Sequence, residues 1–467
     1  MKYRAHLALA LLAGVSIPSG YVYAQTLEEA MAMAYNSNPT LLAERAKLRA
    51  TDEEVPQALS SWRPTVKLSS DVAASANFSN ISTGVNRRQH RNPRSVDLTV
   101  TQSLFRGGRT LAATSGAENT VKAQRASLLS AEQAVLLNAV EAYMDVFRDQ
   151  AVIELNINNE QVLKRQLEAT QDRFDVGEIT RTDVHQAEAR LARATADRIK
   201  SEGDLDASRA AFRSVVGEYP EKLSLPKRAM DPLGDAEAAV KTAVSDNPNV
   251  LKAKYDEKVS LDNIDEVWGE LLPSVDLTGT ASRSFEASSE TSRADTYKAK
   301  LSLTIPLYQS GAVYSRLREA RQLAAEKRLK IDQAQRTATE KATKAWESLK
   351  TARARKKSFQ TQIKASEVAL DGVQREAAVG SRTVLDVLDA EQELLDAKVS
   401  YVRSQRDEAV AYFRLKESMG QLTATKTNLA VDFYDPQSHY REVRTKWFGG
   451  SSSGEGASAK TAGAKTK

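Results

Sequence analysis

The chain has 467 residues, of which 27% are charged, and it contains only 12 Pro and 21 Gly. So few helix-breaking residues argue against a loop-rich globular protein and favour long helices. Cys is absent, which excludes disulfides, thiol chemistry and a lipid-modified cysteine. The formal net charge of +5 arises from 66 basic and 61 acidic residues, and this near-balance gives no reason to expect nucleic-acid binding.

The first 24 residues are typical of a secretory signal peptide. Lys2 and Arg4 form its basic end, residues 7–15 are apolar, and the small-residue sequence Val-Tyr-Ala at 22–24 precedes the expected cleavage site. An uncleaved anchor helix is the alternative, but the apolar run is well short of the ~20 residues that cross a bilayer. We therefore expect the mature chain to leave the cytoplasm.

The sequence contains two copies of one unit. In the N-terminal part of the unit, residues 27–42 match 236–251 with an offset of 209, and in the later part residues 176–191 match 379–394 with an offset of 203. The change of offset falls in a polar stretch, where a loop can absorb it. Because the matches follow one order through both halves, they predict an internal duplication.

The duplication divides the mature chain into four segments. We expect a first repeat at 25–220, a linker at 221–234, a second repeat at 235–425 and a C-terminal periplasmic segment at 426–467. The end of that last segment, residues 449–467, has low complexity and is predicted to be disordered.

Each repeat begins with a helical pattern that ends before a proline, Pro64 or Pro273. Alternating residues then predict a β-hairpin, at 64–105 in the first repeat and at 273–307 in the second. Strands of about ten residues cross a bilayer at a tilt. Apart from the signal segment, all long apolar stretches are interrupted by charged residues. Any part of the mature chain that spans a membrane is therefore expected to consist of strands. The same alternation would also suit a half-buried hairpin of a water-soluble protein.

A long helical pattern follows each hairpin, at 109–176 and at 312–379, and a return helix follows it, at 180–217 and at 383–420. Each long helix would extend roughly 100 Å. Apolar residues of the first long helix form two adjacent seven-residue rows: Val121, Leu128, Val135 and Ala142, and Leu129, Leu136 and Tyr143. Two rows favour neighbours on both sides of the helix, and therefore a closed wall of antiparallel helices.

Glycines mark both junctions between strand and long helix. The motif "SLFRGGRT" at 103–110 contains Gly107 and Gly108, and "PLYQSGAV" at 306–313 contains Gly311. Neither motif has the GxxxxGK[ST] spacing of a phosphate-binding loop. We expect these glycines to turn each outgoing strand into a helix.

One chain offers four strands, which cannot close a barrel. An open sheet edge in lipid would leave backbone groups unpaired at several kcal/mol each. Strands embedded in a membrane would therefore need several chains. Two chains would give about 8 strands with a filled interior, and three would give about 12, enough to leave a channel.

These features resemble the TolC family of outer-membrane efflux and secretion channels. The resemblance covers about residues 25–430, and its most specific part is "VGSRTVLDVLDAE" at 379–391. It is supported by the signal peptide, the duplication, the Asn-Pro pair in each N-terminal helix and the two junction motifs. The sequence thus predicts a mainly α protein with membrane β-structure, made of two β-hairpins and long antiparallel helices.

The resemblance implies a homotrimer whose 12-strand barrel in the outer-membrane lipid continues as an α-helical tunnel across the periplasm. It further implies docking onto an inner-membrane pump through a periplasmic adaptor protein. The chain would then be the exit duct of a tripartite efflux or type I secretion system, without a cofactor.

The turn that ends each long helix carries the candidate functional residues. Gly177 and Gly380 can close the helix in the left-handed conformation. A threonine then begins each return helix, and Asp183 or Asp386 follows three residues later. Thr-x-x-Asp is a capping-box pattern, which offers a structural explanation of both aspartates. Capping does not explain Asp389.

Asp386 and Asp389 lie three residues apart and so share one face of the return helix. In a trimer that face would present six carboxylates around the axis, which would attract cations and repel anions. The resemblance implies that these two aspartates form the pore constriction.

The resemblance also implies a tie that holds the tunnel shut, in which Arg382 bonds to Thr182 and Asp183 of the neighbouring hairpin. The sequence departs from the family pattern at Ala377, where relatives can carry a tyrosine that adds a second tie. The closed state would therefore depend more on Arg382.

The two turns would form the exposed periplasmic end of the molecule. By resemblance, their candidate adaptor contacts are Gly177, Glu178, Gly380 and Ser381. At the opposite end, residues 79–94 contain four arginines and would form an external loop. Two interpretations of this loop are open: it contacts only solvent, or it recognises lipopolysaccharide.

Other protein classes share some of these features. A periplasmic adaptor also uses helical hairpins, but it would show one hairpin flanked by β-rich halves, and a secreted structural coiled coil is a further alternative. The histidines of the mature chain, His90, His185 and His439, are widely separated and lack the spacing of a metal or zinc-protease site. We therefore expect neither a metal site nor an enzymatic activity in this chain.

Overall fold

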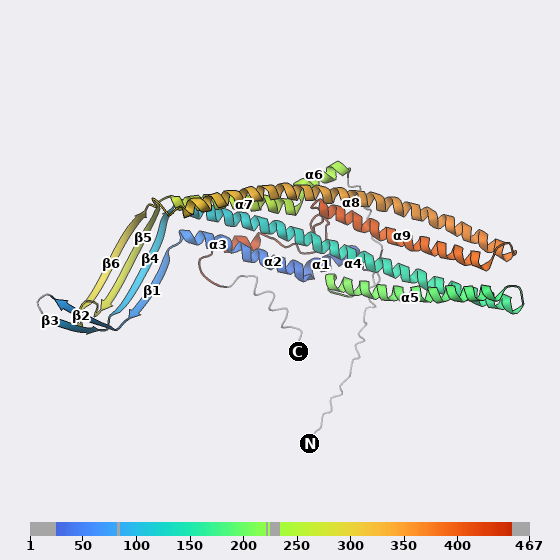
Figure 1. Cartoon of the computed structure of the whole chain (residues 1–467), viewed down its shortest axis with the longest axis horizontal. Coiled ribbons are helices and arrows are strands. Elements are labelled where there is room, and N and C mark those ends of the chain that lie inside the picture. Colours follow the sequence, from blue (N-terminus) through green and yellow to red (C-terminus); the bar gives the residue numbers. More distant parts are fainter. Residues whose placement is uncertain (1–24, 82–84, 221–222, 225–233, 451–467) are drawn as a thin grey trace, which may run out of the picture.

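The computed structural model describes residues 25–81, 85–220, 223–224 and 234–450. The predicted signal peptide, most of the predicted linker and most of the predicted disordered tail lie outside the described residues. The molecule is elongated, with a β-sheet at one end and long helices that extend away from it (Figure 1). Helices dominate the described part, which confirms the prediction of a mainly α protein with some strands.

The helical pattern at the start of each repeat is broken into shorter helices. In the first repeat these are α1 (Leu27–Ser37), α2 (Pro39–Asp52), α3 (Glu54–Leu59) and η1 (Ser60–Trp62). In the second they are α6 (Ala236–Asp246), α7 (Pro248–Trp268) and η2 (Gly269–Leu271).

The Asn-Pro pair causes the shared break. The side chain of Asn38 accepts the Thr40 N–H at 3.0 Å, so Asn38 caps α2 and Pro39 occupies its first turn. The amide of Asn38 also donates to the Val215 carbonyl at 2.9 Å. Asn247 makes the equivalent contacts in the second repeat. Each pair therefore joins the N-terminal helices to the end of its return helix.

The main sheet has four antiparallel strands in the order β1-β4-β5-β6. Their bounds are β1 (Thr65–Val72), β4 (Arg94–Arg106), β5 (Ser274–Phe285) and β6 (Arg293–Thr304). Contact between β4 and β5 joins the two repeats. β1 and β6 are the two edges of this sheet in the described chain.

The stretch predicted as an external loop forms a second hairpin. Its strands are β2 (Ser75–Ile81) and β3 (Val85–Arg91), which pair with each other and not with the main sheet. The loop prediction for 79–94 was therefore wrong for the described residues. Most residues in these two sequences, SANFSNI and VNRRQHR, are polar, so the sequences lack the sustained apolar alternation from which strands were predicted.

The main sheet has one apolar face. Leu68, Leu98, Ala281 and Tyr297 lie on one rung, and Val66 and Val100 lie on the next rung of that face. Val66, Leu68 and Tyr297 are more than 60% exposed in the single chain. The intervening positions, such as Lys67, Thr99, Thr280 and Lys298, place polar side chains on the opposite face.

Two long helical hairpins form the greater part of the helical structure. The first consists of α4 (Arg109–Asp175) and α5 (Arg181–Val216), and the second of α8 (Ala312–Ala378) and α9 (Val384–Ser418). Both hairpins extend away from the sheet, and their turns lie at the far end (Figure 1). Among the helices of the described residues, none combines the length and the hydrophobicity that a membrane span requires.

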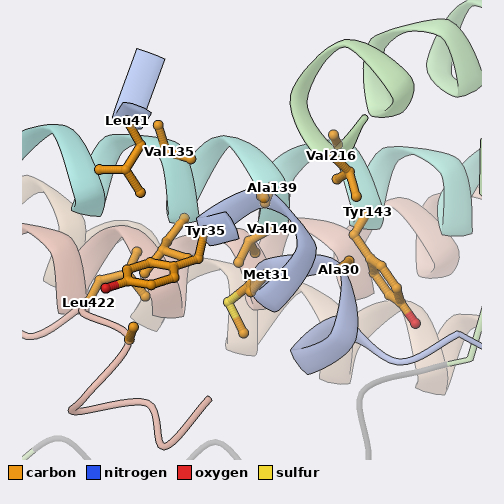
Figure 2. Close-up of a cluster of buried hydrophobic side chains, with 14 of the residues drawn as sticks. Ala30, Met31, Tyr35, Leu41, Val135, Ala139, Val140, Tyr143, Val216 and Leu422 are labelled. Atoms are coloured by element: carbon orange, nitrogen blue, oxygen red, sulfur yellow. The ribbon is translucent and has the colours of Figure 1, made fainter. Parts of the chain in front are cut away.

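The main core surrounds the middle of α4. Leu136, Ala139, Val140 and Tyr143 are fully buried there. They lie against Ala30, Met31 and Tyr35 of α1 (Figure 2).

The segment 421–448, here called the C-terminal strap, completes this core. It contains the short helix α10 (Ser438–Val443), and its Leu422 is fully buried. The guanidinium of Arg45 lies 4.5 Å from the ring centre of Tyr35 and 5.1 Å from that of Tyr434, so it joins α2 to the strap. The first repeat is thus closed by residues from the other end of the sequence.

Candidate functional site at the hairpin tips

The two hairpin turns have the same backbone geometry. Gly177 and Gly380 both have φ +79°, a conformation in which other residues are strained. In the first turn Glu178 N–H donates to the Arg173 carbonyl at 2.9 Å, and Ser381 N–H makes the equivalent bond in the second turn at 3.0 Å. These bonds close α4 and α8 as Schellman motifs. The duplicated sequence therefore produces the same turn twice.

Capping boxes start both return helices. Thr180 N–H donates to the Asp183 carboxylate at 3.0 Å, and Thr383 N–H donates to that of Asp386 at 2.9 Å. The reciprocal bonds, from each aspartate N–H to the threonine hydroxyl, are also present. The capping explanation thus fits both aspartates.

Capping also affects the charge of Asp386. The hydrogen bonds from Thr383, with a smaller contribution from the charge of Arg382, lower the pKa of the Asp386 carboxyl below its usual value. Asp386 is partly exposed beside the turn. A capping role therefore keeps this carboxylate ionised and does not exclude a role in a pore.

Asp389 has a partner that sequence reasoning missed. Its carboxylate forms an ion pair with the guanidinium of Arg190 on α5, and 57% of the Asp389 side chain remains exposed. The two residues are 199 positions apart, in different repeats. No local pattern signals such a pair, since it depends on how the hairpins pack.

The predicted tie residues are not joined within one chain. Arg382 Nε donates to Glu376 Oε2 at 2.9 Å, across its own turn, and this bond raises the pKa of the Arg382 guanidinium. Asp183 is used in its capping box, and Thr182 is exposed. The tie from Arg382 to Thr182 and Asp183 of the neighbouring hairpin stays a prediction.

A buried glutamate lies just beyond Asp386 and Asp389, the predicted constriction residues. Glu391 of α9 is 9% exposed, and its Oε2 atom has no hydrogen-bond partner. Burial raises the pKa of this carboxyl, and a hydrogen bond from Gln374 of α8 opposes the shift only in part. Glu391 ends the motif at 379–391, but sequence reasoning gave it no role.

The junction glycines lie at the opposite end of the long helices. Gly108 and Gly311 are the residues before α4 and α8, with φ +79° and +75°. Gly107 has φ +62°, and a Cβ there would lie 2.3 Å from the carbonyl oxygen of Gly269. Any side chain at 107 would therefore push the sheet junction away from η2 of the second repeat.

The described residues contain no group of three or more His, Cys, Asp or Glu side chains arranged to hold a metal ion.

Comparisons with known proteins cover most of the chain. A family model described as "Outer membrane efflux protein" matches residues 30–218 and 239–421. The outer membrane efflux protein BepC of Brucella suis is 33% identical over 443 residues, which cover 95% of each chain. The outer membrane protein TolC of Escherichia coli is 26% identical, over 89% of this chain and 86% of its own.

Solved channels share the fold. The outer membrane channel CmeC of Campylobacter jejuni superposes with a TM-score of 0.77 at 15% identity, over 90% of this chain and 89% of that one. The outer-membrane channel OprN superposes with a TM-score of 0.74 at 21% identity, over 84% of this chain and 89% of that one.

Proposed function

This chain belongs to the outer membrane efflux protein family. We propose that three copies of its sheet and helical hairpins form an exit duct. The family consists of outer-membrane channels, and the chain acts as such a channel in efflux or type I secretion. The resemblance to the TolC family is thereby confirmed. One observation carries the proposal: a sheet with an apolar exposed face continues directly into two long helical hairpins.

We propose that three copies close the channel. The sheet of one chain has 4 strands, and its edges β1 and β6 have no partner on their outer sides in the described chain. Pairing of β1 with β6 of a neighbour satisfies both edges and gives a closed ring of about 12 strands. The apolar face then meets outer-membrane lipid, and the polar face lines the lumen.

The hairpin tips are the proposed periplasmic entrance. In a trimer, Asp386 and Asp389 of each chain form a ring of carboxylates at the narrowest point, which attracts cations. Arg382 of one chain bonds to Thr182 and Asp183 of the next chain and holds the closed state. Arg382→Ser then raises the conductance, and an unchanged conductance contradicts this tie.

The tip is also the proposed contact for a periplasmic adaptor, which connects the duct to an inner-membrane pump. Gly177, Glu178, Gly380 and Ser381 form the two exposed turns, and their identical geometry gives an adaptor the same surface twice in each chain. Three copies present that surface six times.

Cargo differs between the named relatives. AprF of Pseudomonas aeruginosa is named for alkaline protease secretion, and CzcC of Cupriavidus metallidurans for cobalt-zinc-cadmium resistance. We propose that the duct is a passive conduit and that the pump selects the cargo.

Site-directed crosslinking tests the adaptor contact. A photoreactive residue at Glu178 or Ser381 is expected to capture a periplasmic protein in cells, and the native mass of the purified channel is expected to be three times that of the chain. A matched probe at Lys350, an exposed residue in the middle of α8, controls for chance capture. Equal capture at Lys350 contradicts the tip contact, and a monomeric or dimeric mass contradicts the trimer.

A further inference from the structure

The two hairpins of one chain touch in two separate places. The first place is a seam between α4 and α9 near the main core. There Arg406 Nε lies 2.9 Å from Asp145 Oδ1, and Arg414 Nη2 lies 2.9 Å from Glu141 Oε1. These pairs join the first repeat to the second well away from the tip.

The second place is a small apolar cluster close to the turns. Its buried members come from all three helices that meet there, α4, α5 and α9: Leu163, Ala187, Ala194, Val384 and Leu388. Arg190 lies on α5 between Ala187 and Ala194, and Asp389 follows Leu388 directly. The ion pair of Arg190 and Asp389 thus borders the cluster. We call the cluster and this ion pair the clasp.

A polar slot separates the clasp from the seam. It has a volume of about 700 Å³ and is lined by residues of α4, α5 and α9, among them Asp149, Asn156, Lys200, Asp396 and Arg403. Because protein atoms do not fill this slot, the hairpins are not packed continuously between the two contacts. The clasp is therefore a separate attachment of the second hairpin to the first.

We propose that Arg190 is a positioning residue of the gate, which holds α9 against the first hairpin of its own chain and neutralises Asp389. The proposal rests on the proposed function, in which Asp389 lines the constriction. In the clasped state the ring carries its full charge only at Asp386. When the tips separate, Arg190 leaves Asp389, so that opening and a stronger cation attraction occur together.

The ion pair is partly exposed, with 26% of the Arg190 side chain and 57% of the Asp389 side chain accessible. Pairs of this kind shift a two-state equilibrium by about two- to five-fold. Arg190→Gln is therefore expected to increase the population of separated tips by that factor without unfolding the hairpins. Arg190→Lys is expected to cause a smaller increase in separated tips than Arg190→Gln, because lysine keeps the charge although it lacks the guanidinium fork.

A distance measurement tests the clasp without any current. The chain contains no cysteine, so spin labels can be placed at Ala189→Cys on α5 and Glu393→Cys on α9, in trimers with a minority of labelled chains. Arg190→Gln is expected to add a longer component to the distance distribution. The control Arg193→Gln removes the same charge one turn along α5, from a residue that pairs with Asp197 of its own helix. An unchanged distribution for Arg190→Gln, or an equal change for Arg193→Gln, overturns the clasp.

Bilayer currents test the effect on charge. Arg190→Gln is expected to raise the cation-to-anion permeability ratio when Asp389 is present and to leave it unchanged in an Asp389→Asn background. Equal effects in both backgrounds overturn the proposed neutralisation. If the wild-type protein gives no current while the labelled distances shift as expected, the proposed duct fails and the clasp stands.

Discussion

The two long helices α4 and α8 occupy matching places in the duplication, yet their surroundings differ. α4 packs against α1, α2, α3 and α5 of its own repeat and against α7 and α9 of the other, whereas α8 packs mainly against α6, α7 and α9. The first seven-residue row is buried in α4, and three of its four counterparts are buried in α8: Ala324, Ile331 and Ala338. The second row is buried at Leu136 but exposed at its counterpart Thr339.

The two repeats therefore share their local structure but not the neighbours of their long helices. The strap closes the first repeat within the chain, as the bond between Ala424 N–H and the Glu132 carboxylate at 2.8 Å illustrates. The single chain leaves Tyr314 and Leu329 of α8 more than half exposed. A neighbouring copy would cover such a face, in keeping with the proposed trimer.

The largest difference between the repeats is expected for matched core substitutions. Leu136→Ala removes a fully buried side chain and is expected to lower the free energy of unfolding by about 2–5 kcal/mol. Thr339→Ala, at the matching exposed position of α8, is expected to change it by less than about 0.5 kcal/mol. Denaturant unfolding of the purified protein measures both. Equal losses would show that another copy buries Thr339 as deeply as the chain buries Leu136.

The next largest difference in stability is expected where the strap contacts α2. Arg45→Ala removes the guanidinium between Tyr35 and Tyr434 and is expected to cost about 1–2 kcal/mol. It is also expected to speed proteolysis of the strap. Lys254, the matching residue of α7, serves as the control, and Lys254→Ala is expected to have less than half the effect. Equal proteolysis of both variants would contradict the role of Arg45 in holding the strap.

The capping boxes should show no difference between the repeats. Thr180→Ala and Thr383→Ala each remove a hydroxyl that accepts the aspartate N–H and donates to the aspartate carboxylate. Each substitution is expected to destabilise its return helix by about 1 kcal/mol. Hydrogen exchange of amides in the first turns of α5 and α9 measures this directly. A much smaller effect at α9 would mean that the clasp, rather than the cap, orders its first turn.

The smallest expected effect depends on pH. Burial against the strap raises the pKa of Glu132 above its usual 4.5. A raised pKa gives a stabilising contribution that is complete below pH 4.5 and is lost as the pH rises through the raised value.

Glu132→Gln is therefore expected to raise the melting temperature by about 1–2 °C at pH 7.5. It is expected to have no effect near pH 4, where the wild-type carboxyl is already protonated. The second repeat carries Gln335 at the matching position. A gain of the same size at both pH values would contradict burial of the charge as the cause.

Local sequence patterns predicted much of the fold, because helix ends and capping boxes depend on residues that are close in the sequence. Pro64 and Pro273 ended helical patterns, and the Thr-x-x-Asp motifs formed capping boxes. The strands β2 and β3 were missed because their sequences are mostly polar and lack sustained apolar alternation. The breaks at Asn38 and Asn247 were missed although each asparagine precedes a proline, since the apolar period continues across them.

The candidate site shows the same division. Asp386 was placed in its capping box from sequence, because its partner lies three residues away. The partners of Asp389 and Arg45 come from other segments of the chain, and only tertiary packing brings them together. Sequence reasoning therefore found the carboxylates but neither the arginine that pairs with one of them nor the strap that completes the core.

In the proposed channel, the tips of several copies form a carboxylate constriction. The most direct test is the reversal potential of the purified protein in a planar bilayer between unequal KCl solutions. We expect cation selectivity for the wild type and its loss in the double variant Asp386→Asn with Asp389→Asn. An unchanged reversal potential in the double variant would contradict the claim.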